Sequence, residues 1–300
     1  MSEKKPIAVV GGVNVDMNGT PFEPLISGDS NPGQVLFALG GVGRNIAENL
    51  SRLGEKVLFL TALGEDQNAA WVRQSCKDLG LDLSESEVIP GGRTSCYLCL
   101  NHQDGNVAAA IADMALYDAL TPEKLSSHLP ALNQCGMVLA DANLPQESLT
   151  YLAENLQVPL CADPVSLRKA SRLIPALPHL FALKPNRGEA AALLGVPEIR
   201  DVEQAARALV SKGVRHVFLS LGKEGVWYDN GRERGREPTH CGEILNTSGC
   251  GDAFFAAACL ALAEGYPIAQ AAALGQRAAG LCARSDSPVN PELCREALGL

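Results

Sequence analysis

The chain has 300 residues, of which 46% are hydrophobic and 20% are charged, and its net charge is −9 with a pI of about 5.1. This composition supports a large apolar core and excludes a disordered chain. The acidic charge argues against a general binder of nucleic acids or membrane surfaces. An anionic substrate would therefore need backbone amides, lysines or a metal ion to hold it.

Neither the cysteines nor the N-terminal residues indicate an exported protein. Ten cysteines in a chain of this length do not make a disulfide scaffold. Cys96 and Cys99 form a CxxC pair, but in the strand predicted around them they face opposite sides, which disfavours zinc. Residues 1–10 are too polar for a signal peptide, and no apolar run approaches the ~20 residues of a membrane span. We expect a soluble, cytoplasmic protein with reduced cysteines.

Short apolar runs alternate with helical patterns along most of the chain. Runs closed by Gly, Pro, Asn or Asp occupy residues 7–13, 56–63, 136–142, 158–164, 179–186 and 215–222. Such runs are typical of strands buried on both faces of a parallel sheet. Residues 43–54 and 201–213 have helical character and end in glycine. This alternation predicts an α/β layered fold with right-handed crossovers.

Two segments break this alternation. Residues 17–39 are rich in Gly, Pro, Ser and Asp, and residues 88–112 read as a hairpin whose turn is "QDGN" at 103–106. Together they predict a small β-sheet that covers a site as a lid. Because no linker or repeat separates independent halves, we expect one domain over residues 1–300.

The stretch "NTSGCGDAFF", residues 246–255, combines glycines with a single acid before an apolar helix. Glycines let the backbone turn tightly, and amides at a helix N-terminus bind phosphate oxygens. A carboxylate there, Asp252, suits a general base that takes a proton from an attacking hydroxyl. The alternative is an ordinary Asp favoured by the helix dipole.

Other polar residues follow the ends of predicted strands, where open parallel sheets bind ligands. They are Asn14, Asp16, Asp163, Asn186 and Ser220. Asn14 and Asp16 suit sugar hydroxyls or a turn, "KPNRGE" (184–189) reads as an acidic helix start, and "SLGKEG" (220–225) reads as a hairpin. The glycine pattern "GGVGRN" (40–45) does not match GxGxxG, so a nicotinamide-dependent oxidoreductase has little support.

Taken together and in order, these segments resemble the ribokinase-like carbohydrate kinases, also called the PfkB family. The likeness covers nearly the whole chain through "GGVNVD", "GGVGRNIAENLSRLG", "KPNRGE", "SLGKEG" and "NTSGCGDAFFAAA". It implies a three-layer α/β/α fold with a mainly parallel central sheet and a small β-sheet lid. It also implies transfer of the ATP γ-phosphate to an alcohol of a sugar or nucleoside.

The resemblance assigns roles residue by residue. It implies that Asp252 is the catalytic base and that Gly249, Cys250 and Gly251 form the anion-hole backbone. It implies an acceptor site formed by Asn14, Asp16, Gly41 and Asn45. It implies an ATP site formed by Lys184, Asn186, Ser220, Gly222, Gly225, Gly249 and Gly251. Asn186 and Glu189 would organise Mg²⁺, in part through water.

Within the family, "SGDSNPGQVLFALGGVGRNIAENLSRLG" (27–54) is most similar to bacterial pseudouridine kinases. This implies 5′-phosphorylation of pseudouridine, with Asp29, Ser30, Asn31 and Asp113 near the base, and a homodimer built through the lids. In the family, an Asp at the start of the second signature helps bind a monovalent cation; Asn246 departs from it, so the resemblance leaves activation by potassium open. A kinase for ribose, adenosine or inosine, and a non-catalytic binder, are the alternatives.

Overall fold

A computed structural model describes residues 4–104, 106–240, 242 and 244–300 of the chain. Its main body is a nine-stranded sheet with the order β15-β14-β13-β12-β11-β10-β1-β4-β6. The strands are β1 (Ile7–Val10), β4 (Val57–Leu60), β6 (Leu81–Asp82), β10 (Met137–Asp141), β11 (Leu160–Asp163), β12 (Ala182–Leu183), β13 (His216–Ser220), β14 (Val226–Asp229) and β15 (Arg234–Glu237). All neighbours pair in parallel except β13–β14 and β14–β15.

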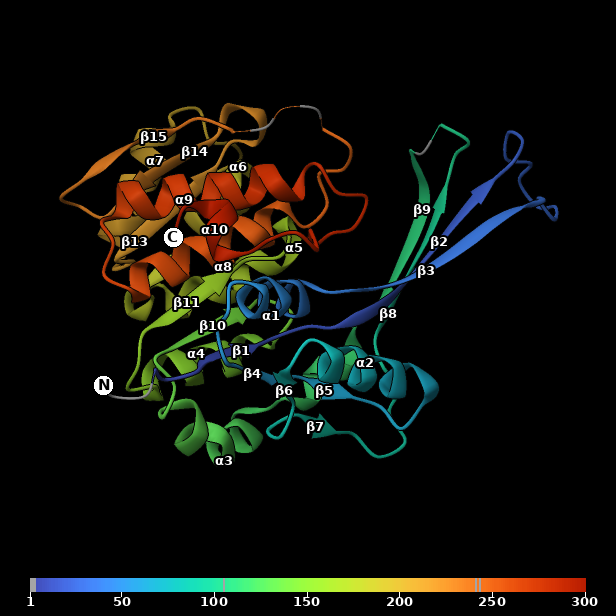
Figure 1. Cartoon of the computed structure of the whole chain (residues 1–300), viewed down its shortest axis with the longest axis horizontal. Helices are drawn as coiled ribbons and strands as arrows, with labels where there is room; N and C mark the ends of the chain where they lie inside the picture. Colours follow the sequence, from blue (N-terminus) through green and yellow to red (C-terminus); the bar gives the residue numbers. More distant parts are fainter. Residues whose placement is uncertain (1–3, 105, 241, 243) are drawn as a thin grey trace.

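Helices cover both faces of this sheet, as Figure 1 shows. One face carries α1 (Val42–Arg52), α2 (Gln67–Asp78), α8 (Cys250–Ala263), α9 (Ile268–Cys282) and α10 (Arg295–Leu298). The other carries α3 (Pro122–Leu132), α4 (Gln146–Asn155), α5 (Leu167–Ala170), α6 (Arg187–Leu194) and α7 (Val202–Ser211), with the 3-10 turns η1 (Ala115–Ala119) and η2 (Ser171–His179). The predicted three-layer α/β/α fold is confirmed.

The central strands β1, β4, β10 and β11 are mainly apolar and buried because they lie between two helical layers. In β1, Ile7 and Val9 pack into the core on one face, and Ala8 and Val10 pack into the core on the other. Each of the six predicted apolar runs contains a strand. The strands are shorter than the runs. A two-stranded piece, β5 (Ala62–Leu63) with β7 (Glu87–Val88), lies apart from the main sheet.

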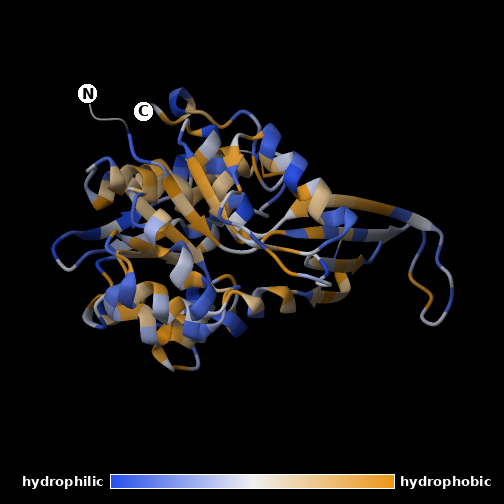
Figure 2. Ribbon diagram, turned by 90° about the horizontal axis from the view of Figure 1, so that it is seen from below, coloured by the Kyte–Doolittle hydropathy of each residue, from blue (hydrophilic) through white to orange (hydrophobic). Residues whose placement is uncertain are grey.

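A second sheet, the lid, extends from the body as a long arm (Figures 1 and 2). Its order is β3-β2-β8-β9, with β2 (Asn14–Pro21), β3 (Gly33–Gly40), β8 (Cys96–Asn101) and β9 (Val107–Asp113). The lid thus begins at residue 14, before the predicted 17, whereas residues 88–95 lead into it from the body. The predicted turn at 103–106 includes Gly105, which lies outside the described residues.

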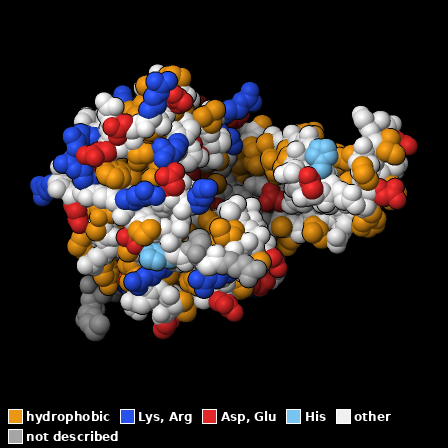
Figure 3. All heavy atoms as spheres, turned by 90° about the horizontal axis from the view of Figure 1, so that it is seen from above, with side chains coloured by type: hydrophobic (Ala, Val, Ile, Leu, Met, Phe, Trp, Pro, Cys, Tyr) orange, Lys and Arg blue, Asp and Glu red, His pale blue; other side chains and the backbone are white. Residues whose placement is uncertain are grey.

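The two faces of the lid differ in polarity. Strand pairing puts Asp16, Asn18 and Thr20 on one face. Leu36, 57% exposed, also lies on that face. The opposite face carries Asp113 at its base and a run of apolar side chains between 41% and 65% exposed: Val35, Phe37, Leu98, Leu100 and Ile111. Figure 3 shows hydrophobic side chains exposed along the lid. Among the described residues, no helix has the length and apolar character needed to cross a membrane.

Candidate active site

The N-terminus of α8 forms a tight backbone cradle. Gly249 caps the helix with φ 76°, and a Cβ atom there would lie 1.8 Å from the carbonyl oxygen of Pro288, so the position requires glycine. A Cβ atom on Gly251 would lie 2.8 Å from Nζ of Lys184, which places the ammonium group directly against the loop. Helix-end amides and an adjacent cation together favour a phosphoryl group at this position.

Asp252 lies in the first turn of α8 and is buried. Its Oδ2 accepts a hydrogen bond of 2.9 Å from Nδ2 of Asn45 on α1. Burial, reinforced by the charge of Asp163, raises the pKa of Asp252 to about 7, although Lys184 and Asn45 act in the opposite direction. A carboxyl group with a pKa close to neutral is suited to proton transfer at physiological pH.

A buried ion pair stands beside this carboxyl group. Nζ of Lys184, just after β12, lies 3.0 Å from Oδ2 of Asp163, the last residue of β11. Burial alone would lower the pKa of Lys184, but the charges of Asp163 and Asp252 raise it above its ordinary value. The ammonium group therefore remains charged next to the cradle, where it can compensate phosphate charge.

Glycines bring α1 close to the end of β1. A Cβ atom on Gly41, whose φ is 102°, would lie 2.5 Å from the carbonyl oxygen of Gly12, and one on Gly43 would lie 2.8 Å from the carbonyl carbon of Gly11. This close packing positions Asn45 beside Asp252. Oδ1 of Asn45 is buried and has no hydrogen-bond partner among the described residues, so it is available to a ligand hydroxyl group.

Asn14 and Asp16 mark the base of the lid. Nδ2 of Asn14 donates to Oδ1 of Asp16 over 2.5 Å, and a Cβ atom on the facing Gly40 would lie 2.2 Å from Oδ2 of Asp16. Burial raises the pKa of Asp16, opposed by the bond from Asn14. The structure therefore brings the predicted acceptor residues Asn14, Asp16, Gly41 and Asn45 to the same end of the sheet as Asp252.

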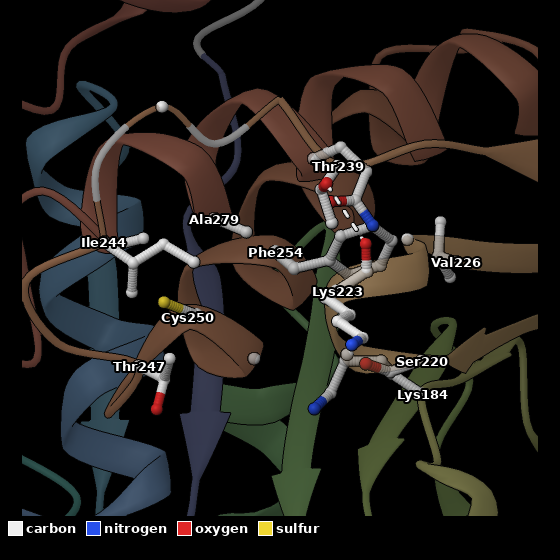
Figure 4. A pocket seen from close by; sticks show the side chains of 16 residues that line it. Lys184, Ser220, Lys223, Val226, Thr239, Ile244, Thr247, Cys250, Phe254 and Ala279 are labelled. Carbon is white, nitrogen blue, oxygen red and sulfur yellow. Dashed lines mark hydrogen bonds between the residues drawn. The ribbon is translucent and has the colours of Figure 1, made fainter.

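A cavity of about 390 Å³ opens on the other side of the cradle (Figure 4). Its polar wall includes Lys184, Ser220 and two glycines, Gly222 at the start of the turn η3 (Gly222–Glu224) and Gly225 just after it. Its apolar wall includes Phe254 and Ile244. At Gly225, where φ is 94°, a Cβ atom would lie 2.1 Å from the carbonyl oxygen of Glu237, so the turn keeps its shape only with glycine. An apolar slot that ends in a cation and helix-end amides matches a base joined to phosphates.

Asn186 and Glu189 form a reciprocal capping box at the start of α6. Oδ1 of Asn186 accepts from the Glu189 amide, and Oε2 of Glu189 accepts from the Asn186 amide, both over 2.9 Å. Burial, followed by the charge of Asp163, raises the pKa of Glu189. No group of three or more His, Cys, Asp or Glu side chains in the described part of the chain can hold a metal ion alone. Asn186 and Glu189 fit Mg²⁺, because this ion is commonly held by one or two carboxylates together with phosphates and water.

Of the predicted base-contacting residues, Asp29, Ser30 and Asn31 lie in the lid loop, and Asp113 lies at the base of the lid. The lid loop is the segment between β2 and β3, beyond the far end of β2, and β2 itself spans about 23 Å at the usual strand rise. Asn31 braces the loop through bonds with the backbone of Ile26, of 2.8 and 3.0 Å. Asp113 pairs with Cys96, on the lid face opposite Asp16, and lies 3.9 Å from Arg93.

Two buried acids in the site have no role assigned from the sequence. Asp141 ends β10 beside Asp163, and its oxygens accept from the amides of Gly12 and Asn143, both over 2.8 Å. Burial raises its pKa. In the sequence, both predicted strands have an Asp near their end. Only the sheet order shows that these two carboxyl groups are neighbours.

A glycine cradle, a buried carboxyl group and a nucleotide-sized cavity at the carboxyl edge of a parallel sheet define a phosphotransferase that acts on an alcohol. Residues 4–293 match the family described as "pfkB family carbohydrate kinase", and the chain belongs to this family. Kinases of this family use ATP, usually with Mg²⁺.

Individual relatives differ in acceptor. A pseudouridine kinase of Escherichia coli is 33% identical over 98% of this chain and 95% of its own. A guanosine-inosine kinase of Exiguobacterium acetylicum is 26% identical over 96% of this chain and 97% of its own. The structure of an Arabidopsis thaliana ribokinase complexed with ribose and ATP superposes with a TM-score of 0.86, at 22% identity and over 98% and 97% of the two chains. At that identity the superposition supports the fold alone.

Proposed function

We propose that this protein is an ATP-dependent kinase that phosphorylates the 5′-hydroxyl group of pseudouridine. The observation that carries the kinase activity is Asp252, a buried carboxyl group with a pKa of about 7 at a glycine-rich helix N-terminus. Pseudouridine as acceptor is supported by the relative from E. coli and by the sequence of the lid loop. Ribose, adenosine and inosine are the alternative acceptors.

The proposed reaction uses the geometry of the cradle. Asn14, Asp16 and the open Oδ1 of Asn45 hold the sugar hydroxyl groups, so the 5′-hydroxyl group faces Asp252. Asp252 removes the proton as the γ-phosphoryl group moves in line. The amides of Gly249 to Gly251 and the ammonium group of Lys184 stabilise the negative charge that develops.

ATP is proposed to fill the 390 Å³ cavity with its base against Phe254 and its phosphates toward Lys184. Glu189 and Asn186 would hold Mg²⁺, in part through water, and the ion supplies charge compensation between the phosphates. Monovalent-cation activation is not part of this proposal. Nδ2 of Asn246 donates to the carbonyl oxygen of Asp286 over 3.3 Å, so an amide joins these two loops.

We also propose that the protein is a homodimer joined through the lids, within one kinase domain over residues 1–300. The apolar lid face, from Val35 to Ile111, is too exposed for an isolated four-stranded arm, and an identical face can cover it. Because Asp29 and Ser30 follow the far end of β2, which spans about 23 Å from Asn14, these residues would meet the base in the partner's site rather than in their own.

A panel of acceptors tests the proposal. ATP turnover is measured with pseudouridine, uridine, adenosine, inosine and ribose at equal concentration. We expect kcat/KM to be highest for pseudouridine. A higher value for another acceptor would transfer the proposal to that substrate, and no turnover with any of them would support a non-catalytic nucleoside or sugar binder.

A further inference from the structure

Two cysteines hold the loop that forms the phosphate cradle. Cys250 is the first residue of α8, Cys282 is the last residue of α9, and both are present as thiols. The Cys282 side chain lowers the pKa of Cys250, so the two thiols interact. The α8 and α9 helices pack closely along their length, so the two thiols meet where these helices join the loops of the site.

Both thiols also bond to carbonyl groups of the surrounding loops. Sγ of Cys250 lies 3.8 Å from the carbonyl oxygen of Asn246. Sγ of Cys282 lies 3.2 Å from the carbonyl oxygen of Pro288 and 3.5 Å from that of Ser248. The residues that shape the cradle, Ser248 to Gly251, are therefore braced from behind by Cys282, while Cys250 lines the nucleotide cavity in front (Figure 4).

We propose that Cys250 and Cys282 form a redox-sensitive dithiol whose oxidation to a disulfide switches off phosphoryl transfer. The two thiols bond to the same loop, Cys282 at Ser248 and Cys250 at Asn246, and Cys250 has access from the cavity. The pKa of Cys250 lies below its ordinary value because of the interaction with Cys282, which favours the nucleophilic thiolate. The inference rests on the proposed nucleotide site.

The chemistry requires a peroxide as the oxidant. The Cys250 thiolate attacks one peroxide oxygen, the O–O bond breaks, and Cys250 becomes a sulfenic acid as the first water leaves. Sγ of Cys282 then attacks the Cys250 sulfur and displaces hydroxide, which takes the Cys282 proton and leaves as the second water. The two thiols lose two electrons, and the peroxide gains two.

The disulfide would act on the cradle in two ways. Bringing the sulfur atoms to the ~2.05 Å of an S–S bond pulls the first residue of α8 toward α9. The carbonyl groups of Ser248 and Pro288 lose the S–H donor that now braces them. Because a displacement of ~1 Å in a catalytic group can reduce turnover ~10²-fold, we expect at least a tenfold loss of activity.

The test compares the wild type with Cys282→Ser, which keeps a donor for the two carbonyl groups but cannot form a disulfide. Cys294→Ser, a half-buried cysteine outside the site, is the matched control. In the wild type and the control, hydrogen peroxide should reduce activity at least tenfold, and dithiothreitol should restore it. Cys282→Ser should accumulate a Cys250 sulfenic acid that dimedone labels, whereas in the wild type condensation with Cys282 should consume the sulfenic acid and leave little to label.

Two measurements on the wild type need no substrate and no stable variant. Peptide mapping should find a Cys250–Cys282 disulfide after peroxide, and phenylarsine oxide, which bridges two neighbouring thiols, should protect both from alkylation. Bound ATP should slow both reactions. Absence of this disulfide, or equal dimedone labelling of Cys250 in Cys282→Ser and wild type, would overturn the inference. If the disulfide forms but no acceptor is ever phosphorylated, the proposed function fails and the dithiol stands.

Discussion

Replacing Asp252 with Asn should stabilise the protein while it removes activity. Burial and the neighbouring charge of Asp163 raise the pKa of this carboxyl group to about 7 in the folded protein. In the unfolded chain an aspartate titrates near ~3.9, so the unfolded state ionises first as the pH rises. Folding stability therefore falls by ~1.4 kcal/mol per pH unit from about pH 4 to pH 7 and is constant above that.

The pKa values of Asp252 in the folded and unfolded states differ by about three. Above pH 7 the ionised carboxylate therefore lowers the free energy of unfolding by ~4 kcal/mol. Asparagine carries no charge, and its oxygen can still accept the bond from Asn45. Asp252→Asn should thus be more stable than the wild type by up to ~4 kcal/mol at pH 8, but by only ~1–2 kcal/mol at pH 5. The same variant should lose ~10²–10⁴ in kcat, with the KM for ATP nearly unchanged.

Urea unfolding followed by tryptophan fluorescence measures the first effect. With a denaturant dependence of ~3 kcal/mol per molar urea, the midpoint should rise by about 1 M at pH 8 and by less than half of that at pH 5. Asp78→Asn makes the same chemical change at an exposed position and should stay within ~0.5 kcal/mol of the wild type. Equal midpoint changes at the two pH values would refute the burial argument, and a kcat loss below about tenfold would refute the role of base.

Four further results follow from the same geometry. The acid limb of kcat/KM should lie near pH 7, and Asp163→Asn, which removes a negative neighbour of the base, should move it to lower pH; an unmoved limb contradicts the electrostatics. Exchange of potassium for a bulky organic cation should change turnover less than about twofold, whereas Asn246→Asp should introduce potassium dependence, and strong dependence in the wild type would be contrary evidence. Ile111→Glu should convert the dimer to a monomer in light scattering, unless the lids do not form the interface. Asp29→Ala should raise the nucleoside KM alone, and mixing it with the inactive Asp252→Asn should restore activity if the loop acts in the partner's site.

The layered fold could be predicted because the features that produce it, apolar strands alternating with helices, are visible in short stretches of sequence. A strand between two helical layers must be apolar on both sides, and the alternation of such runs with helices leaves few topologies. The tight turns at Gly41 and Gly249 could also be predicted, because both glycines precede a predicted helix. The structure gives the reason for glycine there: a Cβ atom would clash with a neighbouring backbone. Neither inference requires knowledge of which strands are adjacent.

The electrostatics of the site could not be predicted in this way. Asp141 and Asp163 belong to strands whose adjacency follows from the sheet order, and the contact of Lys184 with Asp163 follows from it too. The same holds for Cys250 and Cys282, which approach each other only because α8 and α9 pack together. The length of β2 likewise decides that Asp29 is remote from Asn14, and no local pattern fixes that length.

Asn186 and Glu189 cap a helix and are also the proposed Mg²⁺ ligands, and the same arrangement of side chains serves both roles. From the sequence alone, "KPNRGE" is an ordinary helix start, and the capping box confirms that reading. Yet the box binds only Oε2 of Glu189 to the backbone, in a buried place where burial and Asp163 raise the pKa of the carboxyl group. A divalent cation nearby would relieve that repulsion and favour the ionised form. The cap therefore fixes the orientation of a carboxylate whose charge becomes favourable only with a cation present, which makes the helix start and the proposed metal site consequences of the same two bonds.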